Sequence, residues 1–166
     1  METPGEPLEV QVGALLRQRK MKLALAESCT GGLVSHLITN VPGSSDYFLG
    51  GVTSYAYEAK EKLLNVRHAT LMQYGAVSRE TALEMARGVL QALGADISAS
   101  VTGIGGPSGG TPHKPVGLVW IGLSDSQGEW AYRYVFKGSR IENKTQAAHQ
   151  VLRLLIDYLS ELSPRR

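Results

Sequence analysis

Residues 22–39 read KLALAESCTGGLVSHLIT, and their pattern predicts the class of fold. Its first part, residues 22–28, alternates along the chain and predicts a β-strand. The adjacent glycines Gly31 and Gly32 predict a tight turn, after which residues 32–39 place apolar side chains at helical spacing. The expected buried residues of that helix are Leu33, Val34, Leu37 and Ile38. A strand, a glycine turn and a helix in direct succession are typical of an α/β domain.

Four further segments are predicted to be strands, because β-branched, aromatic and other apolar residues fill them. They are residues 51–57, 96–102, 116–123 and 129–136. Only residues 124–128 separate the last two, and the turn sequence DSQG at 125–128 predicts a hairpin. A hairpin makes its two strands antiparallel, so we expect a mixed sheet.

Helical spacing of apolar residues predicts the remaining elements. The expected helices are residues 8–20, 58–64, 69–74, 79–93 and 141–162. Ser78 is expected to cap the fourth of these and Gly94 to end it, while Ser44 or Ser45 could cap a short helical turn. We therefore expect one domain over residues 8–162, with loose tails at residues 1–7 and 163–166.

Composition bounds the class of protein. The chain has 166 residues, of which 43% are hydrophobic and 19% charged, and this fits a globular domain. Its 17 basic and 15 acidic residues leave a net charge of +2, so we expect no nucleic-acid partner. The single cysteine, Cys29, excludes an internal disulfide. The chain start lacks a signal pattern and no apolar run reaches the roughly 18 residues of a membrane span. We expect a cytoplasmic protein that does not contact a membrane.

The motifs of metal and nucleotide cofactors are missing from the sequence. The four histidines and the single cysteine have no metal-ligand spacing, so we expect no metal and no cofactor. Residues 105–110 resemble a phosphate loop, but Thr111 stands where its lysine belongs, and Ser108 replaces a glycine of the dinucleotide fingerprint. The loop at residues 103–115 holds five glycines and three prolines. It either binds an anion through backbone N–H groups or simply joins two strands.

Nucleophilic chemistry is the remaining possibility. Two turns rich in small residues, at residues 27–32 and 42–46, could each present a serine hydroxyl. Lys60, at a predicted strand-to-helix junction, is the candidate base, because partial burial lowers the pKa of a lysine. The alternative is that Ser44 caps a helix and Lys60 is solvated. For Cys29 we favour packing over a nucleophilic role.

Four motifs then occur in order: AESCTGG at residues 26–32, VPGSSDYFLGGVTSYAYEAKEKLLNV at 41–66, YGAVSRETALEMA at 74–86 and TGIGGPSGGTPHKPVGLVW at 102–120. Together they resemble the C-terminal domain of the competence/damage-inducible protein CinA, over residues 8–162 and in a stand-alone form. The resemblance implies a three-layer α/β/α sandwich with a mixed, mostly parallel five-stranded sheet. It also implies an amidohydrolase that converts nicotinamide mononucleotide (NMN) and water to nicotinate mononucleotide and ammonia.

The resemblance also implies the site residues. Ser45 is the implied nucleophile, Lys60 its base and Tyr55 a third catalytic residue. The oxyanion needs fixed donors, most simply backbone N–H groups of the turn around Ser45. Arg140 and the loop at residues 103–110 are implied to bind the substrate phosphate. The implied substrate-binding residues are Ser28, Thr30, Gly43, Ser44, Thr102, Gly103 and Arg140. Two positions depart from the family pattern: Ser139 replaces an aspartate and Tyr57 an asparagine.

A second interpretation stays open beside the enzyme. The chain could be a catalytically weak accessory or binding module linked to competence or the DNA-damage response. The expected partners are the small molecule NMN and further copies of this chain, as a homo-oligomer.

Overall fold

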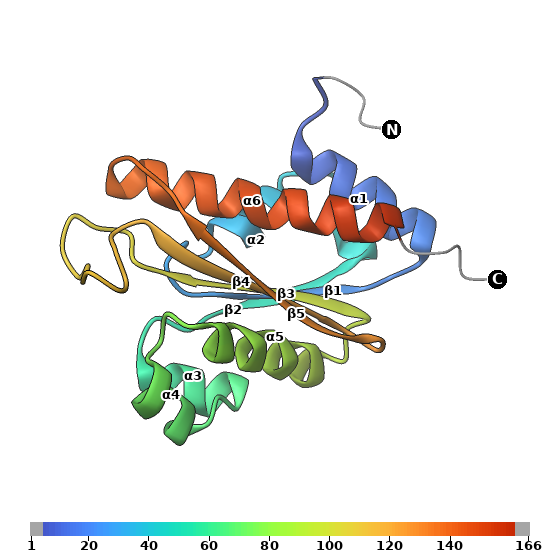
Figure 1. The fold of residues 1–166 in the computed structure, drawn as a ribbon. Helices are drawn as coiled ribbons and strands as arrows, with labels where there is room; N and C mark the ends of the chain where they lie inside the picture. Colours follow the sequence, from blue (N-terminus) through green and yellow to red (C-terminus); the bar gives the residue numbers. More distant parts are fainter. Residues whose placement is uncertain (1–4, 162–166) are drawn as a thin grey trace.

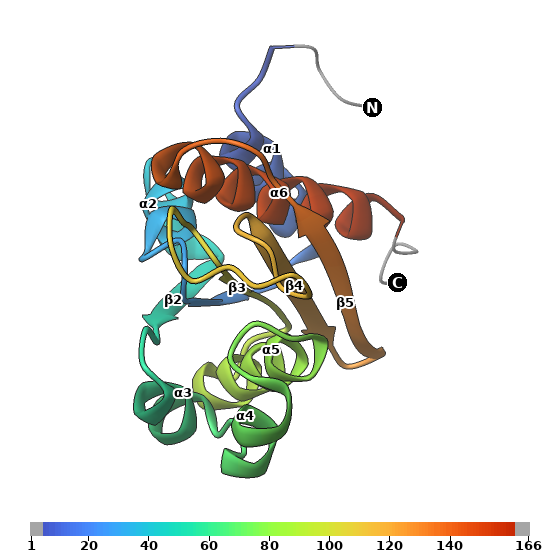
Figure 2. The same ribbon diagram turned by 60° about the vertical axis from the view of Figure 1, so that its left-hand side comes forward.

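The computed structural model describes residues 5–161, so the tail predicted at residues 163–166 and most of the one at 1–7 lie outside the described residues. The chain forms a sheet between two layers of helices, as expected (Figure 1). One layer holds α1 (Leu8–Arg19), α2 (Leu33–Thr39) and α6 (Arg140–Glu161). The other holds α3 (Tyr57–Leu64), α4 (His68–Tyr74) and α5 (Arg79–Leu93). Figure 2 shows α3 and α4 on the outer side of α5, away from the sheet.

The sheet has five strands in the order β2-β1-β3-β4-β5. The strands are β1 (Leu23–Glu27), β2 (Phe48–Thr53), β3 (Ile97–Gly103), β4 (Leu118–Asp125) and β5 (Gly128–Val135). β1 is parallel to both of its neighbours, whereas β4 is antiparallel to β3 and to β5. Four strands therefore point the same way and only β4 is reversed, which confirms the mixed, mostly parallel sheet. The Asp125 carboxylate closes the β4–β5 turn by accepting hydrogen bonds from the N–H groups of Gln127 and Gly128.

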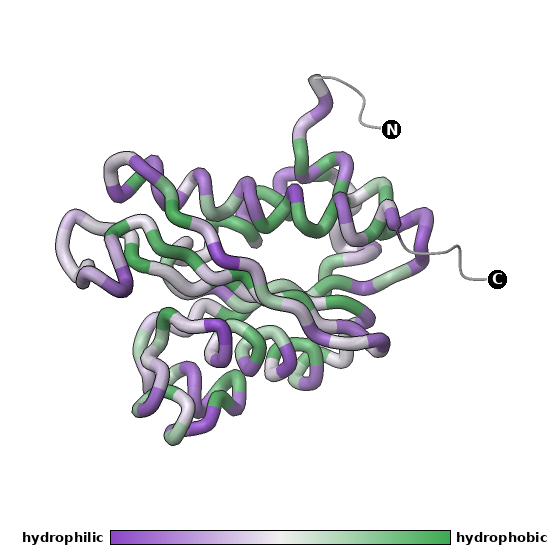
Figure 3. Tube along the Cα trace, viewed as in Figure 1, coloured by the Kyte–Doolittle hydropathy of each residue, from purple (hydrophilic) through white to green (hydrophobic). Residues whose placement is uncertain are grey.

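Strand β1 is buried along its whole length, so the alternation seen in its sequence does not mark a solvent-exposed face. Helices cover both faces of the sheet, and a strand in that position is apolar or neutral on both sides. Figure 3 shows that hydrophobic and hydrophilic residues instead alternate along the long helices α5 and α6. The core between the sheet and α1, α2 and α6 includes Leu23, Leu25, Ile97, Val101, Val151 and Leu155.

The second strand begins and ends earlier than predicted. The sequence predicts it at residues 51–57, but β2 spans Phe48–Thr53, paired in parallel with β1 from Leu23↔Phe48 to Glu27↔Thr53. The Ser54 N–H still donates to Glu27 O, after which the chain leaves the sheet. Tyr55 consequently lies in the connection beyond the strand, and Tyr57 begins α3.

The helix ends show which capping predictions hold. Ser78 Oγ accepts the N–H of Thr81 at the start of α5, and Gly94 ends that helix with a positive φ of 64°, both as predicted. The short 3-10 helix η1 (Ser44–Asp46) instead has Gly43 at its N-cap and no side-chain cap, so the capping role predicted for Ser44 or Ser45 is wrong. Gly43 takes this position because its φ of 77° suits a residue without a Cβ.

Gly88 allows α5 to pack directly against the end of α3. A Cβ at this position would overlap the carbonyl oxygen of Leu64, which is backbone and cannot rotate away. We expect Gly88→Ala to lower the free energy of unfolding by about 2–3 kcal/mol, although alanine is the better helix former. Urea unfolding measures this, with the exposed α5 substitution Gln91→Ala as the control. An unchanged midpoint in Gly88→Ala would contradict the close approach.

Candidate active site

The parallel strands place three chain segments at one edge of the sheet. Ser28 follows β1, Ser54 follows β2, and Gly103 is the last residue of β3, so their positions meet where these strands end. In open α/β sheets, ligands bind beyond the carboxyl ends of the strands. Lys60 reaches this edge from the first turns of α3.

A buried lysine and a serine form the centre of the site. Lys60 Nζ donates to Ser28 Oγ at 2.9 Å and to the backbone oxygen of Ser54 at 2.7 Å. Lys60 is 1% exposed and Ser28 is 8% exposed, so the serine is the member of the pair nearer to solvent. The alternative in which Lys60 is solvated is therefore excluded. Lys60 is buried at the strand-to-helix junction, as the other alternative predicted.

The surroundings of Lys60 favour its neutral form. Desolvation by burial lowers the pKa of its amine from 10.5 to about 8. Among the described residues, no carboxylate lies within ion-pair distance of Lys60. A neutral amine can donate one hydrogen to Ser54 O while its lone pair accepts the hydroxyl proton of Ser28. This is the arrangement that a serine nucleophile and its base require.

Glu27 holds the turn that carries Ser28. Its carboxylate accepts hydrogen bonds from Thr30 Oγ1 at 2.6 Å, from the Val34 N–H at 2.9 Å and from both the N–H and the hydroxyl of Ser35. The buried Glu27 therefore ties the end of β1 to the start of α2 and fixes the backbone between them. This role of Glu27 was not predicted from the sequence. A lone acidic residue closing an apolar strand is the signal that points to it.

Thr30 and Cys29 are structural parts of the same turn. Thr30 is 1% exposed and its hydroxyl is used by Glu27, so its side chain is not available to a substrate in this arrangement. Burial raises the pKa of the Cys29 thiol to about 12, which keeps it protonated and unreactive at neutral pH. The preference for packing at Cys29 thus agrees with its environment.

The structure does not bring Ser45 and Lys60 together. Ser45 lies in η1 before β2 begins, whereas Lys60 follows the end of β2, and a strand of this length spans on the order of 17 Å. Ser45 is exposed, Ser44 is buried and Gly43 lies against the Arg17 guanidinium, all beside α1. The structure therefore does not support the implied pairing of Ser45 with Lys60, and the serine that contacts Lys60 is Ser28. The choice of Ser45 rested on the family resemblance, which does not give the distance between two side chains.

Tyr55 and Arg140 meet across the site. Arg140, the first residue of α6, donates from Nη2 to the Tyr55 hydroxyl at 2.7 Å and from Nη1 to Gly106 O at 2.9 Å. Among the described residues, no hydrogen bond joins Tyr55 to Ser28 or Lys60. The 62% exposed Tyr55 therefore lies at the rim of the site, beside Arg140 and away from Lys60.

The glycine-rich loop is anchored on both sides of the site. Thr102 Oγ1 donates to Ala76 O, and a Cβ on Gly103 would come within 3.1 Å of Cys29 Sγ and 2.8 Å of Leu118 O. The buried Asn143 of α6 donates through Nδ2 to Gly105 O and Gly138 O, a positioning role that was not predicted from the sequence. Thr102 is 1% exposed and fully engaged, so it supports the loop rather than presenting its side chain.

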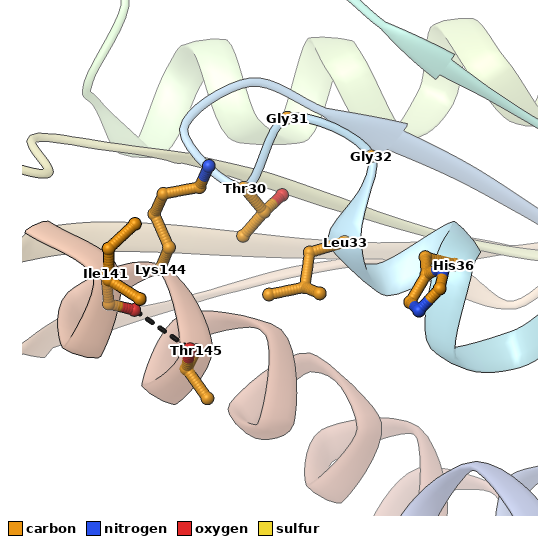
Figure 4. A pocket seen from close by; sticks show the side chains of 8 residues that line it. All are labelled: Thr30, Gly31, Gly32, Leu33, His36, Ile141, Lys144 and Thr145. Carbon is orange, nitrogen blue, oxygen red and sulfur yellow. Dashed lines mark hydrogen bonds between the residues drawn. The ribbon is translucent and has the colours of Figure 1, made fainter.

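A hollow of about 430 Å³ opens beside the Ser28 turn, between the start of α2 and the start of α6 (Figure 4). Thr30, Gly31, Gly32 and Leu33 line one side, and Ile141, Lys144 and Thr145 line the other. The Lys144 side chain extends toward Gly31, whose added Cβ would lie 3.7 Å from Lys144 Nζ. Arg140 and Lys144 are one helical turn apart on α6, so both cations face the same edge.

Ser139 and Tyr57, the two residues that depart from the expected family pattern, both form hydrogen bonds. Ser139 and Glu142 cap the start of α6 reciprocally: the Ser139 N–H donates to Glu142 Oε2, and the Glu142 N–H to Ser139 Oγ. Ser139 thus does the capping work that an aspartate would do. The Tyr57 hydroxyl accepts the Ala76 N–H at 3.3 Å and so contacts the α4–α5 connection.

Among residues 5–161, no group of three or more His, Cys, Asp or Glu side chains is placed to hold a metal ion. None of the described helices has the length and apolar character needed to cross a membrane.

Comparison with known proteins assigns relatives to this architecture. A profile described as the CinA C-terminal domain matches residues 5–159. A CinA-like protein of Desulfotalea psychrophila is 50% identical over 148 residues, covering 89% of this chain and 36% of the relative. A CinA-like protein of Chloroherpeton thalassium is 47% identical over 162 residues, covering 95% of this chain and 39% of the relative. The chain thus spans less than two fifths of these curated relatives.

Solved structures match over almost their whole length. The competence damage-inducible protein A of Klebsiella pneumoniae superposes with a TM-score of 0.91 at 32% identity, covering 94% of this chain and 97% of that one. The competence/damage inducible protein CihA of Agrobacterium tumefaciens superposes with a TM-score of 0.87 at 34% identity, covering 97% and 100%. The fold therefore exists elsewhere at this size.

Proposed function

The chain belongs to the CinA C-terminal domain family, and from this membership we propose that it hydrolyses the carboxamide of NMN to nicotinate mononucleotide and ammonia. One observation carries the proposal: the buried Lys60 amine contacts Ser28 Oγ at 2.9 Å, and its pKa is lowered to about 8. A serine beside a neutral amine base is suited to acyl transfer from an amide. The positively charged pyridinium ring of NMN makes its amide carbon more electrophilic.

The proposed reaction has two halves. Neutral Lys60 accepts the Ser28 proton as Oγ bonds to the carboxamide carbon, and the protonated Lys60 then gives a proton to the departing ammonia as the C–N bond breaks. In the second half, Lys60 takes a proton from water, which attacks the acyl-enzyme. The bond to Ser28 Oγ breaks, the proton returns to the serine, and nicotinate mononucleotide leaves.

The oxyanion is assigned to the turn that follows the nucleophile. The expected donors around Ser45 lie at the other end of β2 and cannot serve. The Thr30 N–H makes no hydrogen bond to another described residue, and Glu27 holds the turn in one conformation. Preformed donors of this kind stabilise the tetrahedral intermediate without reorganising during the reaction.

Direct measurement of ammonia tests the proposal. Purified chain is incubated with NMN, and ammonia and nicotinate mononucleotide are quantified together. Equal, enzyme-dependent release of both products is expected. If neither forms, the chain is not an NMN amidohydrolase, and the accessory role suggested by the competence and damage names of its relatives becomes the better interpretation.

Arg140 and Lys144 are proposed to bind the substrate phosphate, because both cations of α6 face the Ser28 edge. We expect Arg140→Ala to raise KM for NMN about ten- to a hundredfold, as a charge-assisted contact of roughly 1.5–3 kcal/mol would predict. Steady-state kinetics measure this, and the exposed Arg153→Ala on the same helix is the matched control. A KM in Arg140→Ala equal to that of the control would remove Arg140 from the phosphate site.

A further inference from the structure

A second hollow, outside the candidate active site, carries an unusual set of side chains. Its volume is about 400 Å³, and it lies between the start of α5, strands β4 and β5 and the glycine-rich loop. Three cations, Arg79, Lys114 and Arg133, line it together with one carboxylate, Glu80. Two aromatic side chains, Trp120 and Tyr74, also line it. None of the residues assigned to the reaction is among them.

The strand register places Trp120 and Arg133 on the same side of the sheet. Thr102 pairs with Trp120, and Trp120 pairs with Arg133, so these three side chains share one face. Thr102 Oγ1 donates to Ala76 O, in the connection that leads into α5, which identifies the face as the one covered by α5. Trp120 and Arg133 therefore line the hollow from the sheet, while Arg79 lines it from the first turn of α5.

Along the contact between α5 and β5 (the α5–β5 seam), the positive charge of an arginine is paired with a carboxylate at one end only. Nearer the end of α5, Arg87 meets Glu129 of β5 in two hydrogen bonds of 2.5 and 2.6 Å. About two turns earlier on α5, and four residues further along β5, Arg79 and Arg133 line the same hollow, and both carry positive charge. Among the described residues, neither has a carboxylate within ion-pair distance.

The lining matches the three parts of a nucleotide. Unpaired guanidinium groups suit a phosphate, for which arginine provides bidentate donors. A partly exposed tryptophan beside a tyrosine provides a surface for a planar base. The Glu80 carboxylate can accept hydrogen bonds from ribose hydroxyls. A volume of about 400 Å³ is in the range of small-molecule sites and is too small for a folded partner.

We propose that this hollow is a binding site for a nucleoside 5′-monophosphate, separate from the site of the reaction. The base lies on Trp120, and the phosphate accepts hydrogen bonds from Arg79 and Arg133. Lys114 already donates to Tyr74 O, so it frames the hollow and adds positive potential rather than a direct contact. The proposal does not depend on the amidohydrolase activity, because it uses none of Ser28, Lys60 or Arg140.

Titration calorimetry with AMP and with UMP tests the proposal on the full chain. We expect one equivalent to bind, and each of Arg79→Ala and Arg133→Ala to weaken binding about tenfold or more. The matched control is Arg87→Ala on the same seam, which should bind as the unsubstituted chain does. Thermal unfolding of each variant verifies that the fold is retained. Quenching of tryptophan fluorescence on binding should disappear in Trp120→Phe, which leaves Trp130 in place.

Each other outcome overturns the proposal in a recognisable way. No binding of either nucleotide, or equal affinity in Arg79→Ala and Arg133→Ala, would show that the hollow is not a nucleotide site. Weakened binding in Arg140→Ala instead would place the nucleotide in the reaction site. Inorganic phosphate binding as tightly as AMP, with quenching unchanged in Trp120→Phe, would show an anion site without base recognition.

Discussion

Replacing Ser28 with alanine is expected to lower kcat for NMN by about 10³-fold or more, with KM changed little, because the hydroxyl acts in the chemical step. The serine is the one that contacts the buried Lys60, at 2.9 Å. Its removal leaves the Glu27 network intact, because Glu27 is bonded to Thr30, Val34 and Ser35 and not to Ser28. The substrate should therefore still bind, which calorimetry with NMN on the inactive variant would verify.

Two further serines serve as controls for this prediction. Ser45→Ala changes an exposed residue at the opposite end of β2 and should keep near-normal turnover. Ser54→Ala leaves the backbone oxygen that accepts from Lys60 and should have a small effect. The assignment of the nucleophile would fail if Ser45→Ala abolished turnover while Ser28→Ala retained it, although amide hydrolysis itself could still be the reaction.

Replacing Lys60 with methionine is expected to lower kcat by a similar factor, because methionine fills the buried space and cannot accept a proton. Loss of the base and loss of the nucleophile disable one unit, so the Ser28→Ala/Lys60→Met double variant should be little worse than either single one. Lys60→Arg should also be inactive, since a guanidinium stays protonated at any working pH. Substantial turnover in Lys60→Met would remove the lysine from the chemistry.

The pH dependence follows from the same residue. The reactive form of Lys60 is the neutral one, and burial lowers the pKa of its amine to about 8. The rate should therefore be low at acidic pH, rise tenfold per pH unit below the pKa, and level off above about pH 8. A kcat profile from pH 6 to 10 measures this rise. A profile that is flat or falls through pH 8 would contradict a lysine base.

The pattern of residues was sufficient to predict most elements of the fold. Helix α5 begins and ends at the predicted residues, because Ser78 and Gly94 act locally, through a hydroxyl cap and a positive φ. The hairpin of β4 and β5 is equally local, since its turn joins the two strands directly. The end of β2 was misplaced by about four residues, because its register is set by pairing with β1. Pairing between distant segments leaves no periodic signal in a single strand.

The candidate site also combines features predicted from the sequence with features that depend on the packed structure. From the sequence, Ser28, Tyr55 and Lys60 could be placed in motifs, and the family resemblance singled out Arg140, because a resemblance carries residue identity along the chain. Which serine contacts the lysine depends on the packing of the strands and could not be read from the sequence. Parallel pairing places the ends of β1 and β2 at one edge, so Ser28 lies against Lys60, while Ser45 lies at the other edge. Burial, which lowers the pKa of Lys60, is likewise a property of the packed core around it and not of its neighbours in sequence.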